Sequence, residues 1–139
     1  MHNAKPIGVV SLVAMAVVTI LAAWTTHLQV FAVSPSNVVQ LTIKTFSSVI
    51  KGNELVMVQF YAPWCPHCQE LAPQYEFAAR RMKGPDGAVF AKVDCVAEVA
   101  LCDSQGVLSY PTLKAYRNGQ PQIYQGHLKT DAMTAFLQS

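Results

Sequence analysis

Two cysteines separated by two residues are the part of this sequence best suited to chemistry. Cys65 and Cys68 enclose Pro66 and His67, and the apolar segment 55–61 precedes them. Proline is favoured at the first position of a helix, because its missing N–H would have no partner there. The sequence therefore predicts a helix that begins at Pro66, with Cys65 at its N-cap and Cys68 close enough for a disulfide.

The start of a helix gives these two sulfurs different properties. Free backbone N–H groups and the helix dipole favour negative charge, so we expect Cys65 to react as a thiolate. A protonated His67 would favour that charge further. A thiolate is the attacking species in disulfide exchange, which makes the pair suited to redox chemistry. The sulfurs themselves store the electrons, so no cofactor is expected.

Other uses of closely spaced cysteines fit the sequence less well. Cys65 and Cys68 could form a plain stabilising disulfide or half of a zinc site. A zinc ribbon needs a second close pair, whereas Cys95 and Cys102 lie further apart. Haem attachment needs a histidine directly after the second cysteine, and Gln69 stands there. We therefore favour redox chemistry and expect no bound metal.

The hydrophobic pattern around the cysteines predicts an α/β sandwich with parallel and antiparallel strands. Segment 55–61 is nearly all apolar and β-prone, as in a central strand covered on both faces. Asn118 and Gly119 predict a hairpin, and Pro73 should kink the helix that contains it. The expected order is βαβαβαββα, with strands near 38–43, 55–61, 88–93, 112–117 and 123–124, and helices near 45–51, 66–82, 96–105 and 130–137.

Helical spacing and aromatic residues identify the expected core. In the helix from Pro66, the residues Leu71, Tyr75 and Met82 fall on one face. We also expect core positions for four phenylalanines: Phe46, Phe77, Phe90 and Phe136.

The first 32 residues form a leader that differs in composition from the rest. Residues 7–24 carry no charge, and small residues around Ala32 stand where a signal peptidase cuts. We expect either a cleaved signal peptide, with a mature chain from Val33, or a membrane anchor through residues 7–24. A buried helix fits less well, because nothing amphipathic marks an inward face. Either leader would bring the domain at 33–139 into the secretory pathway, where disulfides form.

Composition limits the classes of function. The chain has 139 residues, of which 52% are hydrophobic and 13% are charged, so one domain with a real core follows the leader. The formal net charge is +2, and basic residues cluster only at Arg80, Arg81 and Lys83. Nucleic-acid binding needs a basic stripe, so no nucleic-acid partner is expected.

The segment around the cysteines resembles the active site of a known family. Residues 60–76 read Phe-Tyr-Ala-Pro-Trp-Cys-Pro-His-Cys-Gln-Glu-Leu-Ala-Pro-Gln-Tyr-Glu. This stretch looks like that of a catalytic domain of the protein disulfide isomerase family, which has the thioredoxin fold. The similarity continues through 92–95, 106–114, 117–119 and 124–126, and so covers essentially residues 36–139.

The resemblance implies a thiol–disulfide oxidoreductase of the secretory pathway, with the endoplasmic reticulum lumen as the expected compartment. Its partners would be unfolded or disulfide-containing client proteins and an upstream thiol oxidase or reductant. Cys65 would attack and form the mixed disulfide, Cys68 would resolve it, and His67 would stabilise the thiolate. The residues expected to position the substrate are Trp64, Pro66, Tyr110 and Pro111.

The resemblance also implies two features of the surrounding structure. The Tyr110–Pro111 peptide bond would be cis and would face Cys65. Cys95 and Cys102 would form a structural disulfide, for which loop closure contributes roughly 2–3 kcal/mol.

This sequence departs from the family at positions that bear on the reaction. The family's usual Gly-His dipeptide is Pro66-His67 here, as in bacterial periplasmic disulfide oxidases, which hints at an oxidant. Where the family has a buried acid that takes the proton of the second cysteine, this chain has Gln59. The family's loop arginine is Leu128, next to Lys129. The sequence also ends without a KDEL-type retention signal.

The missing acid supports a second hypothesis. The chain would then be a membrane-tethered, thioredoxin-like binding or chaperone module with weak redox turnover. In that case the apolar surface near the cysteines would hold unfolded clients, and the cysteines would exchange poorly.

Overall fold

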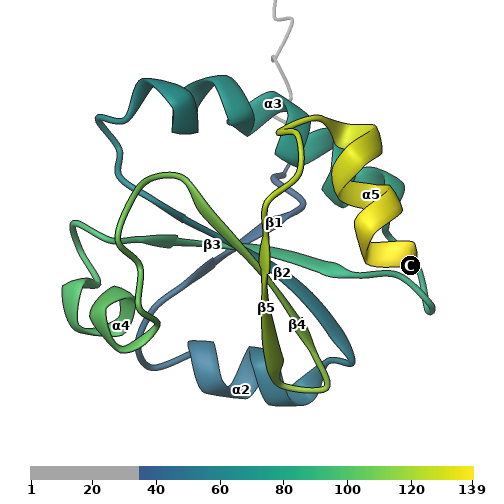
Figure 1. Ribbon diagram of the computed structural model, residues 1–139. Helices are drawn as coiled ribbons and strands as arrows, with labels where there is room; N and C mark the ends of the chain where they lie inside the picture. Colours follow the sequence, from purple (N-terminus) through teal and green to yellow (C-terminus); the bar gives the residue numbers. More distant parts are fainter. Residues whose placement is uncertain (1–34) are drawn as a thin grey trace, which may run out of the picture. The chain divides into compact units, whose positions relative to one another are not determined.

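A five-stranded mixed sheet forms the centre of residues 35–139, the part of the chain that the computed structural model describes (Figure 1). The leader, with its expected cleavage site or membrane anchor, lies outside the described residues. The spatial order is β1-β3-β2-β4-β5; β1, β3 and β2 are parallel, whereas β4 and β5 are antiparallel to their neighbours. The strands are β1 (Val38–Leu41), β2 (Leu55–Tyr61), β3 (Val89–Asp94), β4 (Thr112–Arg117) and β5 (Gln120–Tyr124).

Four helices cover the two faces of this sheet. In Figure 1, α3 and α5 lie on one side of the strands, and α2 and α4 lie on the other. The order of strands and helices is the one expected from the sequence. No helix among residues 35–139 is long and apolar enough to cross a membrane. The helices are α2 (Phe46–Gly52), α3 (Pro66–Arg81), α4 (Val99–Ser104) and α5 (Thr130–Gln138).

Strand β2 is buried on both faces, as its apolar sequence predicts. Met57 belongs to the apolar cluster that includes residues of α3 and α5. Val56, Val58 and Phe60 belong to the cluster on the opposite face, with residues of α2 and α4. The alternation of side chains along a strand therefore places β2 between two cores, which fixes the position of the chain that follows it.

Local sequence signals set the start of one helix and the turn between two strands. Helix α3 begins at Pro66 with Cys65 as its N-cap, as predicted. Pro73 lies inside α3, and the helix continues to Arg81. Asn118 and Gly119 have positive φ angles of 49° and 82°, the conformation of the two-residue hairpin turn that their sequence favours.

The placement of Phe77 in the core was wrong. Its side chain is 54% exposed, and the Arg80 guanidinium lies 4.4 Å from the ring centroid. Phe77 follows Tyr75 by two residues, a rotation of about 200° around the helix, so it points away from the buried face. Of the other phenylalanines, Phe46 and Phe90 are buried, and Phe136 packs partly buried against the core.

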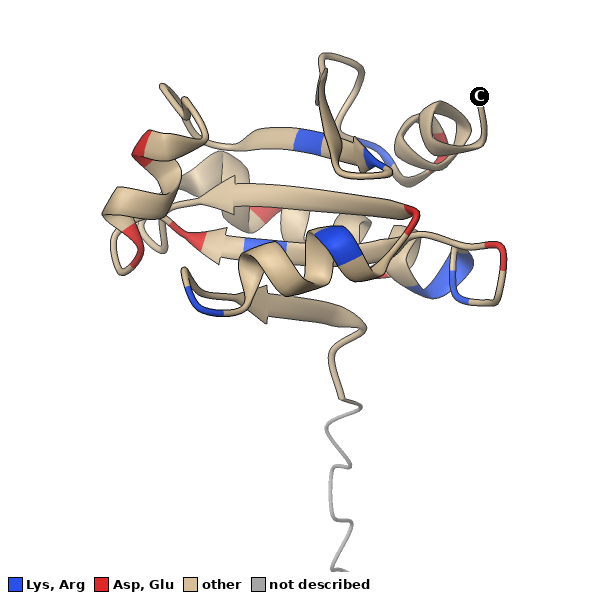
Figure 2. Cartoon of the chain, turned by 90° about the horizontal axis from the view of Figure 1, so that it is seen from below, with Lys and Arg blue, Asp and Glu red and all other residues tan. Residues whose placement is uncertain are grey.

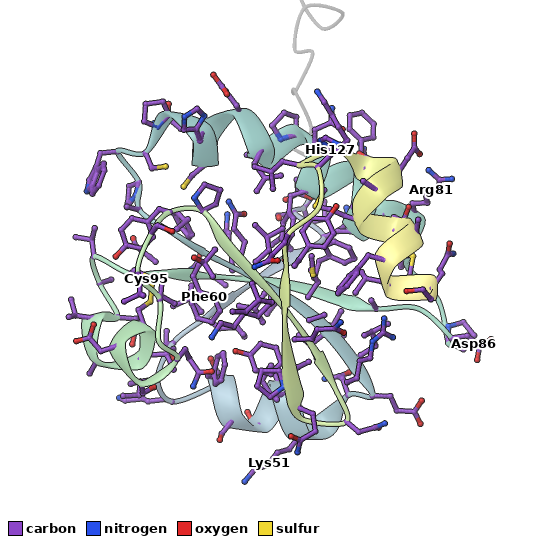
Figure 3. All side chains as sticks on the ribbon, in the orientation of Figure 1. Lys51, Phe60, Arg81, Asp86, Cys95 and His127 are labelled. Atoms are coloured by element: carbon purple, nitrogen blue, oxygen red, sulfur yellow. A yellow bond between two sulfur atoms is a disulfide. The ribbon has the colours of Figure 1, made fainter. Side chains whose placement is uncertain are left out.

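Charged residues are spread over the described surface. In the view of Figure 2, Lys and Arg lie on several separate elements and are interspersed with Asp and Glu. Arg81 of α3 forms an ion pair with Asp131 of α5, and Figure 3 places Arg81 beside α5. On this face, positive and negative residues therefore lie among one another.

A buried tyrosine of α3 forms hydrogen bonds to the sheet. The hydroxyl oxygen of Tyr75 lies 2.8 Å from the carbonyl oxygen of Met57 and 2.9 Å from that of Ala91, so its one proton is shared between β2 and β3. The ring packs edge-on against Phe90, with centroids 5.0 Å apart. Burial raises the pKa of Tyr75 well above its ordinary value, which keeps the hydroxyl a donor.

We predict that Tyr75→Phe lowers the free energy of unfolding by about 1 kcal/mol, because a hydrogen bond to buried carbonyls is lost while the ring is kept. Urea unfolding at neutral pH measures the change. Tyr61→Phe is the control, since its hydroxyl makes only a 3.4 Å contact with Gln40 at the surface. An equal loss in both variants would contradict the role of the Tyr75 hydroxyl.

Candidate active site

The two free cysteines lie where β2 ends and α3 begins. Cys65, the N-cap, has extended backbone angles, and Cys68 lies in the first turn of the helix. The backbone N–H of Cys68 donates to the Cys65 Sγ, with N and S 3.4 Å apart. An N–H donor at the positive end of a helix stabilises negative charge on the acceptor. The start of the helix therefore directs an N–H group at the Cys65 sulfur, whereas Cys68 lies within the first turn.

A loop from the other half of the domain approaches Cys65. The Cys65 Sγ lies 3.7 Å from the carbonyl oxygen of Tyr110. The Tyr110–Pro111 peptide bond is cis, as the family resemblance implies, and leads directly into β4. The loop thus presents backbone polar groups beside the sulfur, where an extended peptide can pair with them.

Exposed aromatic surface borders the sulfurs, which are themselves recessed. Cys65 and Cys68 are only 5% and 4% exposed, whereas Trp64 is 68% exposed. The Trp64 ring meets the Tyr110 ring edge-on, with centroids 6.1 Å apart. A partner would cover these two rings when it reaches Cys65.

His67 lies at the surface of the first turn of α3. Its side chain is 78% exposed, and its Nδ1 lies 3.5 Å from a carboxylate oxygen of Glu70. Within residues 35–139 the structure records no hydrogen bond between His67 and Cys65. The expected effect of His67 on the Cys65 sulfur thus does not depend on a hydrogen bond between the two side chains.

The surroundings of the Cys68 thiol disfavour its charged form. Burial, followed by its interaction with Cys65, raises the pKa of the Cys68 thiol from 9.0 to about 11. At neutral pH this thiol holds its proton. Because only a thiolate attacks a disulfide, Cys68 needs a route by which the proton can leave.

A cavity of about 130 Å³ lies beside Cys68. Gln59 of β2 and Lys92 of β3 line it, and these two residues are neighbours in the sheet register. Gln59 is buried, and no carboxylate is among the residues that line the cavity. The position at which the family resemblance implies an acid is thus occupied by a neutral amide next to a cation.

Lys92 is a site residue that the sequence analysis missed. The sequence pointed to Lys92 only as part of the stretch 92–95 that resembles the family. A feature that could have identified it is its place in the strand at 88–93, where a lysine stands in an otherwise apolar run. That position becomes informative once the pairing of β3 with β2 puts Lys92 beside Gln59.

The loop between β5 and α5 holds the other departures from the family. Leu128 and Lys129 are exposed there, and Lys129 is the N-cap of α5. His127, labelled in Figure 3, is exposed as expected, and its carbonyl accepts a hydrogen bond from the Tyr124 hydroxyl. Among the described residues, Lys129 makes no hydrogen bond to either free cysteine.

Cys95 and Cys102 are joined by a disulfide between the end of β3 and α4 (Figure 3). Both sulfurs are buried in the apolar cluster that contains residues of α2 and α4. The bridge is thus in a different core from the free cysteines. No cluster of His, Cys, Asp and Glu in residues 35–139 is arranged to hold a metal ion.

A larger concave surface, of about 890 Å³, lies at the other end of the sheet. It is lined by the amino-terminal ends of β2 and β3 and by the turn at 84–87. No cysteine or histidine lines it. The chemistry that the sequence indicates is therefore concentrated at the carboxyl end of β2.

Curated relatives of this chain are protein disulfide-isomerases. The enzyme of Aspergillus oryzae is 46% identical over 107 residues, which cover 76% of this chain and 21% of the relative. The probable protein disulfide-isomerase A4 of Caenorhabditis elegans is 48% identical over 93 residues, which cover 66% of this chain and 15% of the relative. The chain thus spans about a fifth of the length of the relatives it matches.

Solved structures with a similar fold come from the same group. The Trx4 domain of ERdj5 has a TM-score of 0.69 and 32% identity, covering 75% of this chain and 95% of that domain. The first thioredoxin domain of mouse protein disulfide-isomerase A4 has a TM-score of 0.69 and 29% identity, covering 76% of each chain. A family model described as Thioredoxin matches residues 37–139. This match includes both free cysteines and nearly all of the described residues, so the chain belongs to the thioredoxin family.

Proposed function

We propose that this chain is a thiol–disulfide oxidoreductase of the protein disulfide isomerase type. The observation that carries the proposal is the hydrogen bond from the Cys68 backbone N–H to the Cys65 Sγ at the start of α3. It favours charge on one sulfur of a closely spaced pair. The relatives named protein disulfide-isomerase, 46% and 48% identical, support the same activity.

The reaction uses the two sulfurs in turn. In the reducing direction, the Cys65 thiolate attacks a client disulfide, and one client sulfur leaves as a thiolate. Cys68 then loses its proton and attacks the Cys65 sulfur of the mixed disulfide. The second client sulfur leaves, and a Cys65–Cys68 disulfide remains. The reverse sequence transfers that disulfide to a reduced client, and an upstream thiol oxidase or reductant sets the direction.

Residues around Cys65 would hold the client. The exposed ring of Trp64 offers apolar contact, and the backbone next to Pro111 offers hydrogen-bonding groups to an extended peptide. Tyr110 packs against Trp64, and Pro66 fixes the first turn of α3. His67, when protonated, adds positive charge near the thiolate. These roles make clients with accessible, unfolded cysteine segments the expected substrates.

The proposed compartment is the secretory pathway, and within it the lumen of the endoplasmic reticulum. The bonded Cys95–Cys102 pair supports this, because such disulfides persist in oxidising compartments. Residues 1–32 would act as a signal peptide, or residues 7–24 as an anchor.

Insulin reduction in the presence of dithiothreitol tests the proposal. The wild-type protein should accelerate precipitation of the insulin B chain, and Cys65→Ala should reduce the rate to background. Lys44→Met, an exposed change in a loop, is the control and should retain full activity. If Cys65→Ala keeps its activity, the proposal fails. If wild type and variant are both inactive in insulin reduction but equally suppress aggregation of an unfolded client, the chain acts as a binding module instead.

We predict selective alkylation of the free thiols by iodoacetamide after gentle reduction. At mildly acid pH, Cys65 should be labelled quickly and Cys68 hardly at all. Because the Cys68 pKa is raised to about 11, its labelling rate should rise about tenfold per pH unit and level off only near that pH. Peptide mass spectrometry separates the two sites, and equal labelling at acid pH would contradict the assignment.

The Cys95–Cys102 bridge should stabilise the fold without taking part in exchange. We predict that Cys95→Ser/Cys102→Ser lowers the free energy of unfolding by roughly 2–3 kcal/mol, because the unfolded chain gains freedom. Insulin reduction at a temperature where the variant is folded should stay close to the wild-type rate. Lost activity at unchanged stability would reverse the two roles.

We predict that Gln59→Glu speeds the resolution of mixed disulfides, because a carboxylate can accept the Cys68 proton and an amide cannot. Stopped-flow measurement of mixed-disulfide decay gives the rate, and Gln59→Met is the matched control without a base. Burial raises the pKa of a carboxyl group. The variant should therefore lose stability as pH rises through that pKa. An unchanged decay rate would mean that another base already takes the proton.

A further inference from the structure

The cavity beside Cys68 contains a cation without an acidic partner. Lys92 forms no ion pair within the described part of the chain. Its ammonium lies 5.8 Å from the centroid of the Tyr61 ring, which also lines the cavity. Lys92 is half-buried, so its charge remains open to an acidic partner from solution.

Gln59 places a second donor at this cavity. The residue is only 4% exposed, it lines the same cavity, and the hydrogen bonds of residues 35–139 include none from its amide group. Because no fully buried side-chain nitrogen or oxygen of the described residues lacks a partner, this amide reaches the accessible space of the cavity. The amide N–H is therefore free to donate to a molecule inside the cavity.

Asp94, an acidic residue on the same strand as Lys92, already accepts hydrogen bonds elsewhere. Asp94 lies two residues after Lys92 on β3 and pairs in register with Tyr61. One oxygen of Asp94 accepts the backbone N–H groups of Val96 and Ala97, at 2.9 and 3.3 Å. Asp94 thus caps the turn after β3 and does not line the cavity.

We propose that this cavity binds a small carboxylate anion and that the anion serves as the base for Cys68. The Lys92 ammonium and the Gln59 amide N–H would hold it. The volume of about 130 Å³ is well above the roughly 10–15 Å³ that a single water requires, so an anion as small as formate, acetate or hydrogencarbonate fits. Both donors match a carboxylate, which accepts through two oxygens.

The bound anion completes the resolving step of the proposed oxidoreductase. A carboxylate oxygen takes the proton from Cys68 Sγ and becomes a carboxylic acid. The Cys68 thiolate attacks the Cys65 sulfur, the bond between Cys65 and the client breaks, and the client sulfur leaves with the electron pair. The acid then returns its proton to the client thiolate or to water. No electrons pass to the anion, so it acts as a catalyst and is not consumed.

The test is the decay of a preformed mixed disulfide on Cys65, measured at fixed pH while sodium formate replaces sodium chloride at constant ionic strength. We expect a saturable acceleration of about a hundredfold, at the lower end of the range for a single general base. Lys92→Met should lose the acceleration, and Lys44→Met, the charge-matched control at the surface, should keep it. Gln59→Glu should decay quickly without formate and respond little to it, because its own carboxylate occupies the site.

Binding is measured separately by the shifts of backbone amide signals around Gln59 and Lys92 in the reduced wild-type protein. Saturable shifts at these positions, absent in Lys92→Met, support the site. A linear response that persists in Lys92→Met, or no response, would overturn it.

Because this proposal rests on the oxidoreductase function, the rate of mixed-disulfide formation is recorded too. Normal formation with formate-insensitive decay rejects the anion site alone, and failure to form a mixed disulfide rejects the function itself.

Discussion

The hydrogen bond between the backbone N–H of Cys68 and the sulfur of Cys65 is the interaction on which the proposed chemistry of this domain depends. It exists because α3 begins directly after Cys65, which puts the sulfur at the end of the helix where N–H groups have no helical partner. Strand β2, held between two apolar clusters, fixes the position at which the helix starts. The two cores therefore position one sulfur atom and one N–H group.

The same arrangement makes the two sulfurs unequal. Cys65 accepts an N–H and lies beside the loop at Tyr110, whereas burial keeps Cys68 protonated. A pair of this kind attacks readily and resolves slowly unless something removes the second proton. The amide at Gln59 cannot do so. Lys92 has no ion pair within residues 35–139, and in our proposal an anion from solution supplies the missing base there. We therefore expect the change at Gln59, in a buried strand, to alter which step of the exchange limits the rate.

The sequence predicted the parts of the structure that depend on local signals or strong periodicity. The start of α3 at Pro66, the hairpin at Asn118 and the two-sided burial of β2 were all confirmed. Phe77 was misplaced, because hydrophobic character alone does not give the phase of a residue on a helix. Lys92 was missed as a site residue for a different reason: its importance comes from the pairing of β3 with β2, which lies outside any local pattern.

Quench-flow trapping of the mixed disulfide tests the inequality of the two sulfurs most directly. The reduced protein is mixed with a peptide disulfide, quenched with acid at short times, digested and mapped by mass spectrometry. The account predicts that the peptide is attached to Cys65 at the earliest times and that attachment to Cys68 stays below detection. Early attachment to both cysteines in similar amounts would contradict it, because the start of α3 would then not select the attacking sulfur.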